Sequence, residues 1–192
     1  MAALLACIAL IAGCYEPADR HLVIVIDVSD QSLERLVRYA QLGFKAQRKA
    51  PEVTIISYGN DADIVYEGPG LRDRGKFNAA LKEALTKPRP GIAKDGTRHA
   101  RALRLAFRSV SNSSSRASLL VLTDGGEEWV EGDLETVISG GQRIKNLDRV
   151  AVLGVLPEHR VTFAKHFAAF GERANVRSLA DADLALLEVA AK

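Results

Sequence analysis

The stretch from His21 to Ser32, HLVIVIDVSDQS, limits the possible folds of this chain more than any other. The five apolar residues Leu22 to Ile26 are too few to cross a membrane and too uniformly apolar for a strand with one solvated face. They predict a central strand that is buried on both faces. Asp27 follows at the carboxyl end of this strand, which is the end where open parallel sheets bind ligands. Asp27 and Ser29 therefore predict an oxygen-rich site at this edge.

Predicted helices and strands alternate along the rest of the chain. Apolar spacing predicts helices over 33–49, 77–85, 97–108, 134–139, 161–170 and 184–191, and strands over 53–58, 62–66, 119–123, 150–156 and 176–178. The strand over 62–66 should pair in a hairpin at the edge, with a loop over 67–75. The alternation predicts an α/β fold, a doubly wound and mostly parallel central sheet flanked by helices. A length of 192 residues suits one domain, and a net charge of +2 gives no reason to expect nucleic acid.

The N-terminal segment 1–13, MAALLACIALIAG, is apolar and uncharged. As a helix it would span roughly 20 Å, short of the roughly 30 Å hydrocarbon core of a bilayer. We therefore interpret it as a secretory signal peptide, although no Lys or Arg follows Met1 as is usual for such signals. The alternative is a buried helix with incidental cysteines. Cys7 and Cys14 are the two cysteines of the chain, so no disulfide bond can cross-link the folded body.

The sequence Leu10-Ile11-Ala12-Gly13-Cys14 resembles a bacterial lipobox. This resemblance implies that Cys14 is lipidated and becomes the mature N-terminus, that residues 14–20 are a short tether and that residues 21–192 form the folded domain. Acyl chains on Cys14, and not a spanning helix, would hold the protein at the membrane. Tyr15 is not the Asp that retains lipoproteins in the inner membrane. The resemblance thus implies the outer membrane of a Gram-negative cell, on its periplasmic side.

Four oxygen-bearing residues are expected to meet at the edge of the sheet. The second fully apolar strand, over 119–123, ends in Asp124, and Thr97 lies in the loop between the two apolar strands. Together with Asp27 and Ser29 they supply two carboxylates and two hydroxyls, which suit Mg²⁺, Mn²⁺ or Ca²⁺ better than zinc. An open coordination position could accept a carboxylate from a partner protein. The alternative is that both acids only cap turns.

These motifs together resemble the von Willebrand factor type A (VWA) domain over roughly residues 20–190. Its metal-ion-dependent adhesion site (MIDAS) uses Asp-x-Ser-x-Ser, a later Thr and an Asp in a Thr-Asp-Gly turn. The corresponding segments here are Asp27-Val28-Ser29-Asp30-Gln31, Gly96-Thr97 and Thr123-Asp124-Gly125. Gln31 replaces the second serine, and its longer side chain would displace the cation or require another rotamer. The resemblance implies a non-enzymatic, lipid-anchored protein-binding module of the cell envelope, for adhesion or as a scaffold.

Two alternative functions remain. One is a doubly wound hydrolase or nucleotide-dependent enzyme, although no G-x-S-x-G elbow occurs. Residues 70–77, GLRDRGKF, match most of a phosphate-binding loop, but Phe77 replaces the hydroxyl that should hold Mg²⁺. The other is a structural envelope protein with a degenerate metal site.

Three further signals concern the surface of the domain. Arg98, Arg101, Arg104 and Arg108 predict a basic helix face, either solvated or in contact with anionic headgroups or an acidic partner. Glu127 and Glu128 should line the rim of the crevice, and Trp129 is either a contact residue or a loop anchor. His159 and His166 are expected at the surface.

Overall fold

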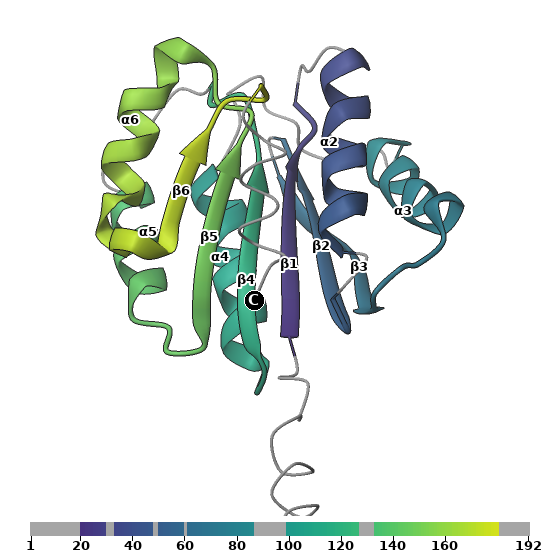
Figure 1. Ribbon diagram of the computed structural model, residues 1–192, viewed down its shortest axis with the longest axis horizontal. Helices are drawn as coiled ribbons and strands as arrows, with labels where there is room; N and C mark the ends of the chain where they lie inside the picture. Colours follow the sequence, from purple (N-terminus) through teal and green to yellow (C-terminus); the bar gives the residue numbers. More distant parts are fainter. Residues whose placement is uncertain are drawn as a thin grey trace, which may run out of the picture.

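The structure of the protein is a computed structural model that describes residues 20–29, 33–47, 50–59, 61–86, 99–126 and 133–180. A six-stranded sheet forms its centre, with helices on both faces (Figure 1). The strands are β1 (Arg20–Asp27), β2 (Glu52–Tyr58), β3 (Ala62–Pro69), β4 (Arg116–Leu122), β5 (Leu147–Leu153) and β6 (Ala174–Arg177). The helices are α2 (Leu33–Gln47), α3 (Arg74–Thr86), α4 (His99–Asn112), α5 (Asp133–Gln142), α6 (Pro157–Phe167) and the 3₁₀ helix η1 (Ala168–Arg173). None of the helices in these ranges is long and apolar enough to cross a membrane.

The strand order is β3-β2-β1-β4-β5-β6, with β3 antiparallel to β2 and every other neighbouring pair parallel. Strand β1 lies between β2 and β4, and its residues Leu22 to Ile26 are each at most 5% exposed. The predicted doubly wound sheet with a central β1 is thus confirmed. The register pairs Ile26 of β1 with Leu122 of β4, so the acids that follow the two strands emerge at the same edge.

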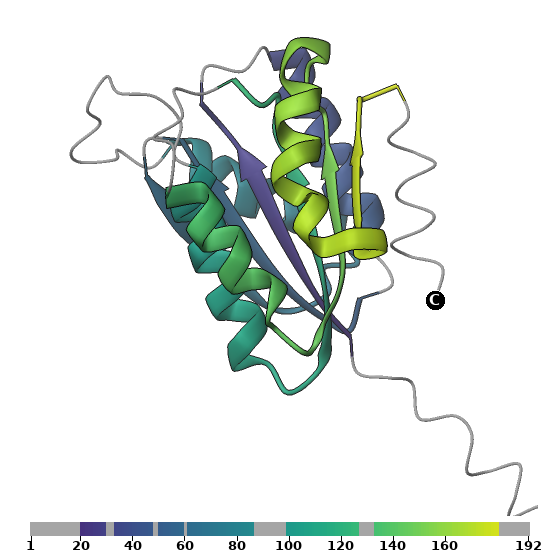
Figure 2. The same ribbon diagram turned by 90° about the vertical axis from the view of Figure 1, so that its left-hand side faces the viewer.

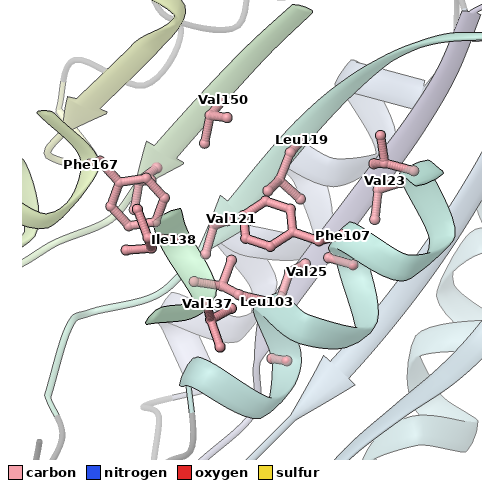
Figure 3. Packing of buried hydrophobic residues seen from close by; sticks show 14 of the residues in the cluster. Val23, Val25, Leu103, Phe107, Leu119, Val121, Val137, Ile138, Val150 and Phe167 are labelled. Carbon is pink, nitrogen blue, oxygen red and sulfur yellow. The ribbon is translucent and has the colours of Figure 1, made fainter. Parts of the chain in front are cut away.

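Two apolar layers hold the helices against the sheet. On one face Val23 and Val25 belong to a cluster with residues of α4, α5 and α6, and on the other Ile24 and Ile26 pack with residues of α2 and α3. Figure 2 shows α5 and α6 in front of the sheet and α2 behind it. Figure 3 shows Phe107 of α4 over the first face. Since successive side chains of a strand point to opposite faces, β1 contributes to both layers, which explains its unbroken apolar run.

Several element boundaries differ from the sequence-based prediction, and three of them have a clear local cause. Strand β3 continues to Pro69, because Gly68 still pairs with Val53 of β2. Strand β5 ends at Leu153, because Gly154 has a φ of +102° that leaves the extended conformation. Helix α6 then begins at Pro157, since proline suits the first position of a helix. The predicted helix over 184–191 lies outside the described residues.

Candidate functional site

Asp27 is fully buried at the carboxyl end of β1. Its Oδ1 accepts hydrogen bonds from the backbone N–H of Ser29 (3.0 Å) and from the Ser29 hydroxyl (2.6 Å). Its Oδ2 accepts one from the hydroxyl of Thr123, which follows β4 (2.9 Å). The Thr123 hydroxyl also accepts a hydrogen bond from the backbone N–H of Gly125 (3.1 Å). The ends of β1 and β4 are therefore joined through this carboxylate.

The environment of Asp27 acts on its pKa in two directions. Burial raises the pKa of this carboxyl, and the Ser29 hydroxyl, His99 and Thr123 each oppose that rise. His99 is the first residue of α4, and its ring lies edge-on to Tyr58 of β2, with centroids 5.4 Å apart. The start of α4 thus reaches the same edge. A cation bound beside Asp27 would stabilise its charged form and further offset the effect of burial.

Asp124 is the second acid of this edge, and its side chain is 19% exposed. Its Oδ1 accepts a hydrogen bond from the backbone N–H of Gly126 (2.8 Å). Its Oδ2 accepts one from Nη1 of Arg35 (2.8 Å), an ion pair between the turn after β4 and the first turn of α2. The backbone N–H of Leu156 donates to the Asp124 carbonyl (2.8 Å), which fixes the turn that carries this acid.

A buried tyrosine lies beside the two acids. Tyr39 of α2 is fully buried, and its hydroxyl has no hydrogen-bond partner among the described residues. Burial raises the pKa of Tyr39, and the negative charges of Asp124 and Asp27 raise it further. A Cβ added to Gly154 would lie 2.5 Å from this hydroxyl oxygen, so the hydroxyl lies directly against the chain that leaves β5. The Tyr39 hydroxyl is therefore a buried donor beside the two acids that no described residue satisfies.

Solved structures share this architecture. The chain superposes on BatB from Bacteroides thetaiotaomicron with a TM-score of 0.64 and 21% identity over 88% of this chain and 96% of that one. For von Willebrand factor type A from Catenulispora acidiphila the TM-score is 0.59 and the identity 22%, over 91% and 42%. The fold is that of the VWA domain. No known family profile matches the chain, and no curated protein is similar to it in sequence.

Two further solved structures are similar to the chain in fold. A D319A mutant of the PilB minor pilin from Streptococcus sanguinis has a TM-score of 0.65 and 10% identity, over 91% of this chain and 61% of that one. Proximal thread matrix protein 1 from the mussel byssus, with a zinc-occupied MIDAS motif, has a TM-score of 0.61 and 9% identity, over 90% and 47%. The chain thus spans about three fifths of the pilin and less than half of the byssus and Catenulispora proteins.

The structure brings together three of the four residues predicted from the VWA resemblance. Asp27, Ser29 and Asp124 lie at the carboxyl ends of β1 and β4, and their role as metal ligands stays a prediction. The other residues of the predicted site and its surroundings, and the lipidation site, lie outside the described residues: Thr97, Gln31, Glu127, Glu128, Trp129 and Cys14. Sequence reasoning missed Arg35 and Tyr39. The sequence gives only a weak sign of the role of Arg35. A basic residue in the first turn of a helix is unfavourable beside the helix dipole, which hints at an acidic partner.

The donors at this VWA edge fit a hard divalent cation. Two carboxylates and the Ser29 hydroxyl offer oxygen ligands, and water can complete the shell. Within the described ranges no cluster of three or more His, Cys, Asp or Glu side chains that could hold a metal ion forms. The buried, unpartnered Tyr39 hydroxyl is consistent with a ligand or water in the crevice. One oxygen of Asp124 is already paired with Arg35.

Two other signals from the sequence have structural explanations. Phe77, in the phosphate-loop-like segment, is fully buried and packs edge-on against Phe44 with centroids 5.7 Å apart. That segment follows the antiparallel edge strand β3, so it lacks the parallel-strand setting of a phosphate loop. On the basic face of α4, Arg101 pairs with Asp61 (2.9 Å) and Arg104 with Asp133 (2.6 Å). These pairs favour the solvated-face interpretation.

Proposed function

We propose that this chain is a non-enzymatic protein-binding module of the cell envelope, for adhesion or as a scaffold, with a MIDAS-like divalent-cation site. Asp27 and Asp124 supply charge, and Ser29 and Thr97 supply hydroxyl ligands. One observation supports the proposal most directly. In a VWA fold, the buried Asp27 carboxylate links the ends of β1 and β4 by hydrogen bonds, and Asp124 lies on the turn that follows β4. A buried carboxylate that accepts three hydrogen bonds is fixed in place before any cation arrives.

The chemistry of the site favours Mg²⁺, Mn²⁺ or Ca²⁺. These cations prefer oxygen ligands and retain water, which leaves positions that another molecule can fill. A carboxylate from a partner protein is the group that best matches an open position on such a cation. The partner would therefore present an exposed Asp or Glu to the crevice. Gln31, which replaces a serine of the family motif, would tune the site through its longer side chain.

The position of the protein in the cell forms the second part of the proposal. Residues 1–13 direct export, and a lipid on Cys14 anchors the chain in the outer membrane on the periplasmic side. The lipobox-like sequence Leu10 to Cys14 supports this assignment. A module held at the membrane by a short tether is suited to gather a partner at that surface.

Thermal unfolding with and without cation tests the site. At a Mg²⁺ concentration of about 100 times Kd, binding to the native state adds about 2.7 kcal/mol, which raises the Tm of a domain of this size by about 5–10 °C relative to EDTA. Asp124→Asn should abolish the rise. Asp63→Asn, which removes the same charge from an exposed position on β3, should retain it. No rise at millimolar Mg²⁺, either in the wild-type protein or in Arg35→Gln, which lacks the ion pair with Asp124, would contradict the cation site and favour the structural, degenerate-site alternative.

Retention of envelope proteins tests the binding role. Immobilised wild-type protein and the Asp63→Asn variant should retain the same partner in Mg²⁺ and release it in EDTA, whereas Asp124→Asn should retain none. Retention that is equal in all three proteins and insensitive to EDTA would exclude a cation-bridged partner.

A further inference from the structure

Arg35 occupies an electrostatically unfavourable place on its own helix. Helix α2 begins at Leu33, so Arg35 lies in the first turn, where the helix dipole disfavours positive charge. Its side chain is nevertheless only 24% exposed, because its guanidinium donates to Oδ2 of Asp124 at 2.8 Å. The ion pair spans 89 positions of the sequence. The ion pair with Asp124 therefore explains why a basic residue lies at this end of α2.

The pair uses the oxygen that a bound cation would need. Oδ1 of Asp124 accepts from the backbone of Gly126 and Oδ2 accepts from Arg35, so described donors contact both oxygens. The two carboxylates of the site carry two negative charges, and Arg35 cancels one of them. A divalent cation close to Oδ2 would repel the guanidinium, since both groups are positive and at this distance little water separates them. Guanidinium and cation would therefore disfavour one another at Asp124.

Helix α2 also supplies a group that can remain at Asp124 when Arg35 leaves. Tyr39 is four residues after Arg35, so the two side chains lie on the same face of α2, one turn apart. Its buried hydroxyl has no partner among the described residues, and after burial the negative charge of Asp124 contributes most to the raised pKa of Tyr39. This hydroxyl can donate to Asp124 or to a water of the cation shell.

We propose that Arg35 competes with the divalent cation for Asp124 and thereby sets the cation concentration at which the site fills. This inference rests on the cation site proposed above. In the closed state Arg35 neutralises Asp124. In the open state the cation replaces the guanidinium at Asp124, and the Arg35 side chain turns toward the rim of the site. An arginine at the rim matches the planar carboxylate of an acidic partner, so filling of the site also creates a second contact for that partner.

Calorimetric titration of the full chain with Mn²⁺ and with Mg²⁺ tests the competition. Arg35→Gln should lower the Kd at least about tenfold. Arg108→Gln removes the same charge from an exposed position on α4 and should leave the Kd within about twofold. Binding by Arg35→Gln where the wild type does not bind would support the proposal most strongly. Equal Kd values for wild type and both variants would overturn it while leaving the cation site intact.

A measurement on the wild-type chain avoids any dependence on how the variant folds. The guanidinium N–H signal of Arg35 in an NMR spectrum, assigned by its loss in Arg35→Gln, should shift toward the position of a solvated arginine as Mg²⁺ is added. The Arg108 signal should not move. Mg²⁺ binding with an unchanged Arg35 signal would overturn the competition alone, and absence of binding in wild type and in folded Arg35→Gln would overturn both the competition and the cation site.

Discussion

Thr123→Val is the substitution that most directly tests how the site is built. The Thr123 hydroxyl donates to the Asp27 carboxylate and accepts from the backbone N–H of Gly125, and the side chain is fully buried. Valine has nearly the same shape, so no cavity forms. The loss of a hydrogen bond to a charged group costs about 1.5–3 kcal/mol and that of a neutral one about 0.5–1.5 kcal/mol. We expect a total of about 2–4 kcal/mol, which lowers the Tm by about 6–12 °C.

Thr123→Ser is the matched control, because it keeps the hydroxyl and removes one methyl group at a cost of about 1 kcal/mol. Urea unfolding in EDTA, followed by circular dichroism at pH 7 and pH 4, gives both free energies. The loss of unfolding free energy caused by Thr123→Val should be smaller at pH 4 than at pH 7. Burial raises the pKa of Asp27, so its carboxyl is more protonated at pH 4. A hydrogen bond from the Thr123 hydroxyl stabilises a neutral carboxyl less than a charged one. Equal stability of the valine and serine variants at pH 7 would refute the reasoning.

Three further predictions concern the backbone, pH and the anchor. Gly154→Ala should lower the free energy of chemical unfolding by about 2–4 kcal/mol, because the φ of Gly154 is +102° and the new Cβ would meet Tyr39. Gly140→Ala is the control: the space around Gly140 is open, so this variant should not destabilise the fold. Burial lowers the pKa of His21, so the unfolded state binds more protons than the folded state at acidic pH. The free energy of unfolding should therefore fall as the pH decreases below about 6.5. His21→Gln should make the free energy of unfolding less dependent on pH in this range, and an unchanged pH dependence would contradict the prediction. Cys14→Ser should remove palmitate labelling and release the protein from the membrane fraction, and retention there would argue against the lipid anchor.

The central strands could be predicted from the sequence because their signal is local. Unbroken apolar runs at Leu22 to Ile26 and Leu119 to Leu122 reflect burial on both faces, and an acid follows closely after each run. Parallel pairing then places Asp27 and Asp124 at one edge without further information. The residues of the site that could be found in advance are those fixed by this topology.

Features that depend on distant partners could not be predicted. The pairing of Arg35 with Asp124 requires knowledge of which helix end faces which strand end, and the local sequence of α2 does not contain it. The sequence predicts a helix over 134–139 that ends before Gly140, yet α5 includes Gly140 and Gly141 and continues to Gln142. At Gly141 the ring of Phe107 occupies the space where a side chain would begin, so close packing between α5 and α4 explains this glycine better than helix termination.

The direction of β1 determines how an anchored molecule would be oriented. The strand enters the sheet at Arg20 and delivers Asp27 at its far end, eight residues and about 25 Å later. If Cys14 carries the proposed lipid, the bilayer lies at one pole of the domain and the two acids lie at the opposite pole. A cation-dependent contact would then be made on the side that faces away from the membrane, where a partner can approach without competing with lipid headgroups.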